Sequence, residues 1–171
     1  MKLGRAGAWI FAMTLGLSFS GEAAAKGGQG AITPFAQKGK LGIGIGGSNL
    51  VSGLTAKYYL DNRIAVQLAL GAWGGYGALV GLDGIYEMPQ LFKQDALSIN
   101  WHVGVGAAVG NYRHSDYGEL VVGASGIAGI GFQLTAIPIE LILDIRPTFL
   151  YGSTWNHPWY GGGGGAIRFF F

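Results

Sequence analysis

Large apolar residues alternate with small or polar residues in eight separate segments of the chain. Such period-two alternation is the pattern of a β-strand with one apolar face, whereas an amphipathic helix repeats its apolar positions every three to four residues. The segments are 41–46, 55–60, 64–70, 80–88, 97–106, 128–134, 139–146 and 166–171. No part of the chain shows a convincing helical repeat, so the pattern predicts an all-β protein.

The second face of these segments consists of glycine, alanine and a few polar or charged residues. Its charged members are Lys57, Asp83, Glu87, Glu140, Asp144, Arg146 and Arg168. A face in contact with water would carry many more charges, whereas these few can pair with one another in a closed interior. We therefore expect the apolar faces to point outward into lipid, as in an eight-stranded antiparallel up-and-down transmembrane β-barrel with a filled interior. A soluble barrel with the opposite orientation is the alternative.

Composition favours the membrane barrel over an ordinary soluble domain. Hydrophobic residues make up 50% of the chain and charged residues 12%, which is about half the charged fraction of a typical soluble domain. After residue 25 there is no run of 18 apolar residues, so we expect no membrane-spanning helix there. Basic and acidic residues are nearly balanced, which argues against a nucleic-acid partner.

The N-terminus has the features of a secretory signal peptide. Lys2 and Arg5 precede an apolar stretch, 6–19, and the small residues 23–25 form a cleavage site. A retained membrane helix is the alternative, but the stretch is shorter than the ~20 residues that a span requires. The chain has no cysteine, so no disulfide is expected. The expected organisation is a signal peptide at 1–25, a short N-terminal periplasmic segment at 26–38 and an outer-membrane barrel at 39–171.

Connections between the segments alternate in length, and aromatic residues gather at segment ends. Residues 61–62 and 135–138 are tight connections, and 71–77, 111–118 and 151–160 are longer ones. With the tight connections in the periplasm, both termini lie there too; the exceptions to the alternation are 88–95 and 49–53. Tyr58, Tyr86, Trp101 and Phe132 then form a periplasmic aromatic girdle, joined by Phe169 and Phe171. Aromatic packing in a soluble core is the alternative.

The last strand ends in Ile167-x-Phe169-x-Phe171. This ending resembles the C-terminal signature of bacterial outer-membrane barrels, which the barrel-assembly machinery reads; Gly165 departs from the signature where an apolar residue is expected. The resemblance implies that Ile167, Phe169 and Phe171 are an assembly signal and that the assembly machinery is a partner. The glycine run 161–165 suits a sharp bend or a close approach of backbone, with a flexible tail as the alternative.

Four further segments carry a second resemblance, to a family of small bacterial outer-membrane barrels of unassigned function. They are SGLTAKYYL (52–60), YEMPQLF (86–92), WHVGVGA (101–107) and IPIELILDIRP (138–147). The plan is similar to that of the transmembrane domains of outer membrane proteins A and X. The resemblance implies the fold, and the family has no agreed catalytic residues.

Three motifs invite a chemical interpretation, and each has a simpler one. Gly42-x-Gly44-x-x-Gly47 has the letters of a dinucleotide fingerprint, but no helix follows it. His102, His114 and His157 lack the carboxylate partners of a metal site. In the segment RHSD (113–116), His114 and Ser115 are neighbours on an extended chain and point to opposite sides, so a serine hydrolase would need another partner such as His157. We therefore expect no enzyme activity, no cofactor and no metal.

The sequence thus predicts an integral protein of the bacterial outer membrane with a structural or surface-interaction role. Its expected partners are outer-membrane lipid, the assembly machinery, and an extracellular ligand bound through loops 71–77, 111–118 and 151–160. The alternatives are an enzyme that modifies outer-leaflet lipid, and a narrow channel or small-ligand carrier. The plugged interior predicted above argues against an open pore.

Overall fold

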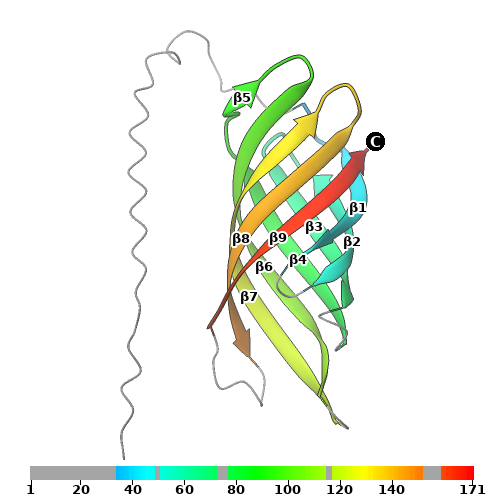
Figure 1. Ribbon diagram of the computed structural model, residues 1–171, viewed down its shortest axis with the longest axis vertical. Helices are drawn as coiled ribbons and strands as arrows, with labels where there is room; N and C mark the ends of the chain where they lie inside the picture. The colour runs from blue at the N-terminus through cyan, green and yellow to red at the C-terminus, as the bar shows by residue number, and fades with distance from the viewer. Residues whose placement is uncertain (1–33, 49–50, 73–76, 115–116, 152–158) are drawn as a thin grey trace, which may run out of the picture.

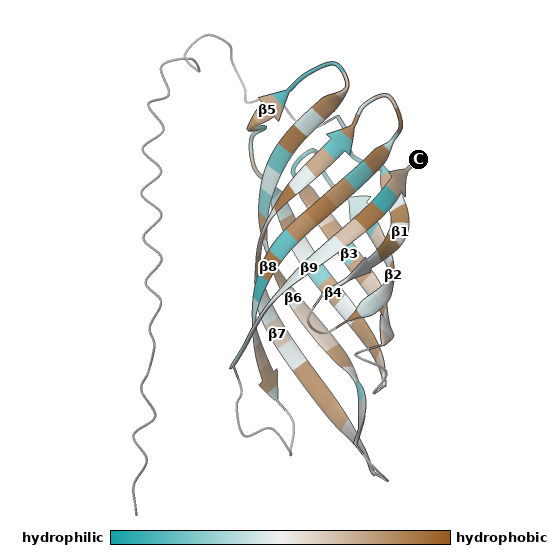
Figure 2. Ribbon diagram, viewed as in Figure 1, coloured by the Kyte–Doolittle hydropathy of each residue, from teal (hydrophilic) through white to brown (hydrophobic). Residues whose placement is uncertain are grey.

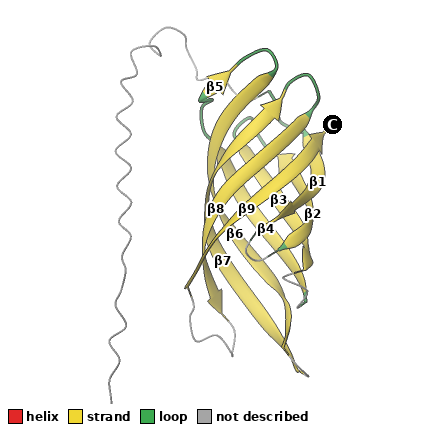
Figure 3. Cartoon of the chain, in the orientation of Figure 1, coloured by secondary structure: helices red, strands yellow, loops and turns green. Residues whose placement is uncertain are grey.

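A computed structural model describes residues 34–48, 51–72, 77–114, 117–151 and 159–171, with the backbone alone for 112–114 and 117–119. All of its regular structure is β-strand, as Figure 3 shows. The strands are β1 (Leu41–Gly47), β2 (Ser52–Tyr59), β3 (Ile64–Ala72), β4 (Ala78–Glu87), β5 (Phe92–Lys93), β6 (Leu97–His114), β7 (Tyr117–Leu134), β8 (Ile139–Tyr151) and β9 (Trp159–Phe170).

The strands form one closed antiparallel barrel (Figure 1). Each wall strand pairs with its neighbours in sequence, and the wall closes where β1 pairs with β9. The two-residue β5 pairs only with β6, so eight strands make up the wall. The predicted fold class, an all-β eight-stranded antiparallel up-and-down barrel, is confirmed.

The two ends of the barrel differ in their connections. The connections 60–63, 88–96 and 135–138 lie at the end that carries the C-terminus, here called the C-terminal end. The other ends of the wall strands lie at the opposite end of the barrel. The connection 88–96 is long because Pro89 interrupts the ladder between β4 and β6. Beyond this proline the chain returns to the same neighbour as β5, with Phe92 opposite Ile99. It therefore extends the wall alongside β6.

The polar stretch 111–118 is not the loop that the sequence predicted. β6 continues to His114 and β7 begins at Tyr117, so only two residues separate the two longest strands, and His114 lies opposite Tyr117. Most of the first half of β7 escaped the sequence analysis because both of its faces are small or apolar, with Val121 and Val122 side by side. Val121 is buried inside the barrel and Val122 faces outward, so the contrast between the two faces that marks the other strands is absent there.

Two residues assigned to the segment before the barrel pack inside its C-terminal end. Phe35 and Ala36 are buried against Tyr59 and Phe170. The Phe35 and Phe170 rings stack with centroids 5.2 Å apart, and the backbone N–H of Gly39 donates to the Tyr59 carbonyl at 2.9 Å. The chain from Phe35 onward therefore belongs structurally to the barrel.

The outward positions of the wall are apolar along its whole circumference. Figure 2 shows hydrophobic positions recurring along the strands that face the viewer, such as β6, β7 and β8. Leu54, Leu143 and Val105 are more than 60% exposed. Among the eight wall strands, no outward-facing side chain that the structure describes is charged. An exposed apolar surface of this extent is far larger than the isolated patches that soluble monomers tolerate.

Candidate functional site

The best candidate site is the barrel interior, where the structure places all seven predicted charges in two groups. The first group is centred on Glu140, which is fully buried. Lys57 Nζ lies 3.0 Å from Glu140 Oε1 and 2.6 Å from Glu87 Oε1. Arg168 Nη1 lies 3.2 Å from Glu140 Oε2. Two cations thus face two carboxylates, so the group is electrically balanced.

Neutral side chains complete the hydrogen bonding of this first group. The Tyr59 hydroxyl donates to Glu87 Oε1 at 3.1 Å, and Asn100 Nδ2 donates to Glu87 Oε2. Gln133 Nε2 donates to Glu140 Oε1 at 3.2 Å. Arg168 donates from Nε and Nη2 to Thr55 Oγ1, at 3.0 and 2.9 Å. Because buried charge is stable only when it is paired and hydrogen-bonded, these contacts explain how the barrel tolerates four ions in its interior.

The second group lies around Arg146, between β4 and β8. Its Nη1 donates to Asp83 Oδ2 at 2.9 Å, and its Nε donates to Asp144 Oδ1 at 2.9 Å. Gln67 Nε2 also donates to Asp83 Oδ2, at 2.9 Å. One cation thus faces two carboxylates. The group lines a cavity of about 30 Å³, which has room for roughly two water molecules.

Glycines on the inner face provide the space that these side chains occupy. A Cβ added at Gly106 would collide with Asp83 Oδ1, and one at Gly164 would lie 2.5 Å from Asp144 Oδ1. One at Gly131 would lie 2.7 Å from Asn100 Oδ1. The interior of an eight-stranded barrel is only wide enough for side chains to fill it. The alternation of glycine with apolar residues therefore makes room inside for side chains from neighbouring strands.

We expect Gly106→Ala to lower the free energy of unfolding by about 1–3 kcal/mol, because the new methyl group displaces Asp83 from Arg146. Gly84→Ala is the matched control, since a Cβ at Gly84 meets nothing within 4 Å; its effect should stay within about 0.5 kcal/mol. Urea unfolding of the two variants in lipid vesicles measures both. Equal effects would show that Gly106 is not needed to accommodate Asp83.

The charged layer lies between two apolar layers that close the interior. At the C-terminal end the layer contains Phe35, Ala36, Tyr59, Ala65, Ile85, Ile127 and Phe170. At the opposite end it contains Val51, Leu79, Ala108, Val121 and Leu150. Val51 reaches this layer because the chain between β1 and β2 turns tightly, with Ser48 N–H donating to the Val51 carbonyl at 2.8 Å. The described residues therefore leave no wide passage along the barrel axis.

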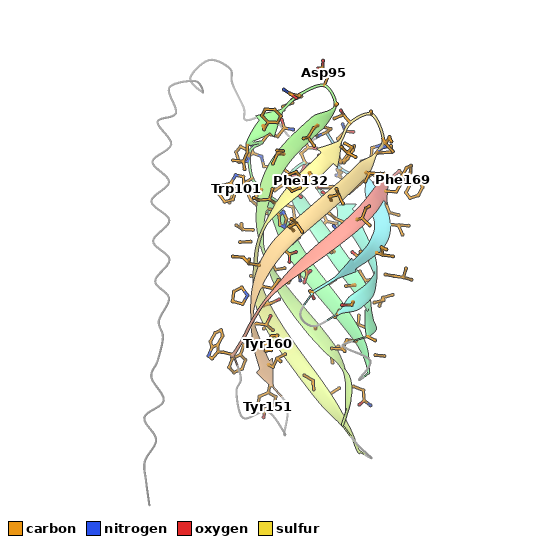
Figure 4. All side chains as sticks on the ribbon, in the orientation of Figure 1. Asp95, Trp101, Phe132, Tyr151, Tyr160 and Phe169 are labelled. Carbon is orange, nitrogen blue, oxygen red and sulfur yellow. The ribbon has the colours of Figure 1, made fainter. Side chains whose placement is uncertain are left out.

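The aromatic residues predicted to form a girdle lie on the outer wall. Tyr58, Tyr86 and Trp101 are 38–45% exposed, and Phe132 is half-buried on the same outward face. Figure 4 shows Trp101, Phe132 and Phe169 in the half of the barrel nearer the C-terminal end, and Tyr151 and Tyr160 near the other end. The proposed assembly residues Ile167, Phe169 and Phe171 are also exposed.

Of the histidine and serine candidates for catalysis and metal binding, the structure describes only the side chain of His102. His102 is buried in the interior. The side chains of His114, Ser115 and His157 lie outside the described residues, as do most of loops 71–77 and 151–160. Within the part of the chain that the structure describes, no three histidine, cysteine or carboxylate side chains could hold a metal ion. The glycine motif 42–47 forms β1, so it is not a nucleotide-binding loop.

Several polar residues of the interior were not predicted to be site residues, although the period-two pattern of the sequence places them on the inward face. Gln67, Asn100 and Gln133 occupy the same inward positions as the charged residues, and each donates to a buried carboxylate. Their inward positions in the period-two pattern were the sequence feature that could have identified these three residues. Phe35 and Val51 lie outside the alternating segments, so their role in closing the interior had no such indication.

The comparisons with known proteins support the fold. Neither a protein-family model nor a curated protein matches this sequence. Among the described residues no helix is long and apolar enough to cross a bilayer. The chain is similar to the crystal structure of the N-terminal β-barrel domain of Pseudomonas aeruginosa OprF, with a TM-score of 0.59 and 20% sequence identity over 78% of this chain and 98% of that one. The likeness confirms the expected plan: this chain has the fold of the small outer-membrane β-barrels.

Proposed function

We propose that this protein is an integral protein of the bacterial outer membrane with a structural or surface-interaction role. One observation carries the proposal: the exposed wall is apolar, while the seven interior charges are half-buried or buried and ion-paired. This arrangement inverts that of a soluble protein and is the one that a lipid environment requires. Refolding the chain from residue 26 into lipid vesicles tests it, because an inserted barrel resists extraction by carbonate and a soluble domain does not.

In the proposed orientation the C-terminal end faces the periplasm. The connections 60–63 and 135–138, which the sequence predicted to be tight, lie at that end. So do Phe169 and Phe171, whose exposed rings are available to the barrel-assembly machinery. The opposite end would then face the cell exterior, where an extracellular ligand would contact segments 71–77 and 151–160 and the ends of β6 and β7, which take the place of the predicted loop 111–118. Outer-membrane lipid would surround the apolar wall between the two ends.

The filled interior favours this role over that of a channel. We expect planar-bilayer recordings of the reconstituted protein to show no discrete conductance, because both apolar layers and the ion pairs would have to move before an ion could pass. A general-diffusion porin inserted under the same conditions is the control. Stable single-channel steps from the protein would contradict the filled interior and favour the channel alternative.

A further inference from the structure

An apolar groove lies on the outer wall across β6, β7 and β8. It has a volume of about 520 Å³, and its lining includes Leu91, Trp101, Ala128, Ile130, Phe132 and Leu143. This volume is within the range of small-molecule sites, roughly 300–1,000 Å³. The charged residue that also borders the groove, Asp144, is ion-paired with Arg146 inside the barrel. The surface that the groove offers is therefore apolar and suits a hydrocarbon chain.

The groove exists because a small residue lies between larger ones. Ala128 of β7 is exposed and lies opposite Val103 of β6 and Ile145 of β8. The rim nearer the C-terminal end is formed by Leu91, which the chain beyond β4 brings alongside β6. The backbone N–H of Leu91 donates to the Ile99 carbonyl at 2.9 Å. The rim is thus fixed to the wall by a backbone hydrogen bond.

The groove extends from the membrane interface toward the middle of the bilayer. Leu91 lies in the connection at the C-terminal end, and Trp101 is one of the girdle residues. Tryptophan and tyrosine rings of a girdle lie at the level of the lipid headgroups. Leu143, at the other end of the groove, is at the centre of β8. An acyl chain in the groove therefore belongs to the leaflet on the side of the C-terminal end, with its headgroup near Leu91.

Basic side chains without an ion-pair partner lie at this end of the barrel. Four of them are exposed or half-buried and pair with no described carboxylate: Lys38, Lys40, Arg63 and Lys93. The described acidic residues outside the interior are two, Asp61 and Asp95, and they lie at the same end. Four basic against two acidic residues leave an excess of positive charge where the headgroups lie. Every described cation of the interior, in contrast, is ion-paired.

Lys93 is the basic residue that the chain places nearest to the groove. It is exposed and follows the rim residue Leu91 by two positions, which is about 7 Å along an extended chain. Figure 4 shows Asp95 at the far tip of the barrel, beyond Trp101 and Phe132. The carboxylate of this connection is thus farther from the groove than its rim, and Lys93 is left to meet the headgroup.

We propose that the groove holds an acyl chain of an anionic phospholipid, of the phosphatidylglycerol class, whose phosphate lies against Lys93. The inference rests on the membrane location proposed above. A zwitterionic phospholipid has the same chains, but its own cationic group offsets the phosphate charge. Basic residues at a membrane surface therefore favour the lipid with net negative charge. The groove supplies the position of the chain, and Lys93 supplies the preference between headgroups.

Quenching of Trp101 fluorescence by brominated lipids tests this proposal, because bromine on an acyl chain quenches a tryptophan that the chain contacts. The chain from residue 26 keeps Trp101 as its single tryptophan when three others are replaced by phenylalanine: Trp73, Trp155 and Trp159. It is refolded into phosphatidylcholine vesicles that contain either phosphatidylglycerol or phosphatidylcholine with the same dibrominated chains. Quenching as a function of mole fraction gives the relative affinity of the two lipids beside Trp101.

Three substitutions in this single-tryptophan chain locate the contact. Lys93→Gln removes the charge beside the groove, and Ala128→Leu fills the groove from an exposed position. Lys38→Gln is the matched control, because it removes a basic residue from the same end on the far side of the barrel. Its neighbour Gly39 is hydrogen-bonded to β2, and three wall strands separate β2 from β7 in either direction.

The single-tryptophan chain and its Lys38→Gln variant should favour brominated phosphatidylglycerol about fivefold, the factor that one basic residue near anionic lipid supplies. The ratio should fall to near one in Lys93→Gln and in Ala128→Leu. Equal affinity for the two lipids without substitution, or a preference that either of these two variants keeps, would overturn the proposal. Absence of quenching by both lipids would overturn the membrane location as well.

Discussion

Replacing Glu140 with glutamine is expected to lower the free energy of unfolding by about 3–5 kcal/mol, the range found when one partner of a buried ion pair is removed. Glu140 is fully buried and faces both Lys57 and Arg168. A neutral amide would leave these two cations with one carboxylate, Glu87, which forms an ion pair with Lys57. Arg168 would then lose the carboxylate with which it pairs. Urea unfolding in phospholipid vesicles, followed by tryptophan fluorescence, measures the change.

A matched control and a compensating variant make this prediction specific. Asp95→Asn removes a carboxylate that is exposed at the C-terminal end, so its effect should stay within about 0.5 kcal/mol. Adding Arg168→Met to Glu140→Gln removes the cation that Glu140 alone paired with among the described residues, and should recover part of the loss. Equal effects of Glu140→Gln and Asp95→Asn would show that the interior ion pairs are not closely coupled to stability.

Leu143→Arg is expected to destabilise the membrane-inserted barrel by about 2–4 kcal/mol, because it places a charge against acyl chains near the middle of the bilayer. Leu143 is 63% exposed at the centre of β8. A water-facing leucine of the same exposure would accept arginine at little cost. Unfolding in vesicles of defined thickness, compared with the wild type, gives the magnitude.

Leu91→Arg provides the comparison, because Leu91 is 62% exposed but lies in the connection at the C-terminal end. Near the membrane interface an arginine costs only about 0–1 kcal/mol. The two leucines thus have the same exposure and differ in the depth that we assign to them. If both variants lost the same stability, the assigned depth would be wrong.

The strands and their faces could be predicted from the sequence because a strand repeats every two residues. Each of the eight segments overlaps one wall strand, and every inward position singled out for its charge lies in the interior. Alternation specifies which side chains share a face, and lipid requires that the charged face be inside. The period-two pattern together with a lipid surrounding is therefore enough to predict the barrel and which face of each strand lies inside it.

The pairing of the interior charges could not be predicted in the same way. Lys57 and Glu140 are 83 residues apart and meet across the interior, so their contact depends on the register of several strands and on side-chain conformation. The sequence placed Glu140, Asp144 and Arg146 on one face of one strand, but Glu140 belongs to one group and the other two to another. The two apolar layers were not predictable either, because Phe35 and Val51 belong to irregular segments.

The glycine run 161–165 has a role that composition alone did not indicate. The run continues the ladder with β8 residue by residue, from Gly161 opposite Pro147 to Gly165 opposite Leu143, so no sharp bend interrupts it. Its inward member Gly164 makes room for Asp144. A Cβ at its outward member Gly161 would meet nothing within 4 Å. The close approach expected at this glycine run is therefore the approach of the Asp144 side chain to Gly164 inside the barrel.

The orientation of alternate side chains on β8 tests the account most directly. The chain has no cysteine, so single cysteines at Leu141, Ile142, Leu143, Asp144 and Ile145 can each carry a nitroxide in the vesicle-inserted protein. We predict that molecular oxygen, which concentrates in acyl chains, relaxes the labels at 141, 143 and 145 strongly, while a water-soluble nickel chelate does not reach them. Nickel access at those three positions, with oxygen access at 142 and 144, would contradict the outward apolar wall.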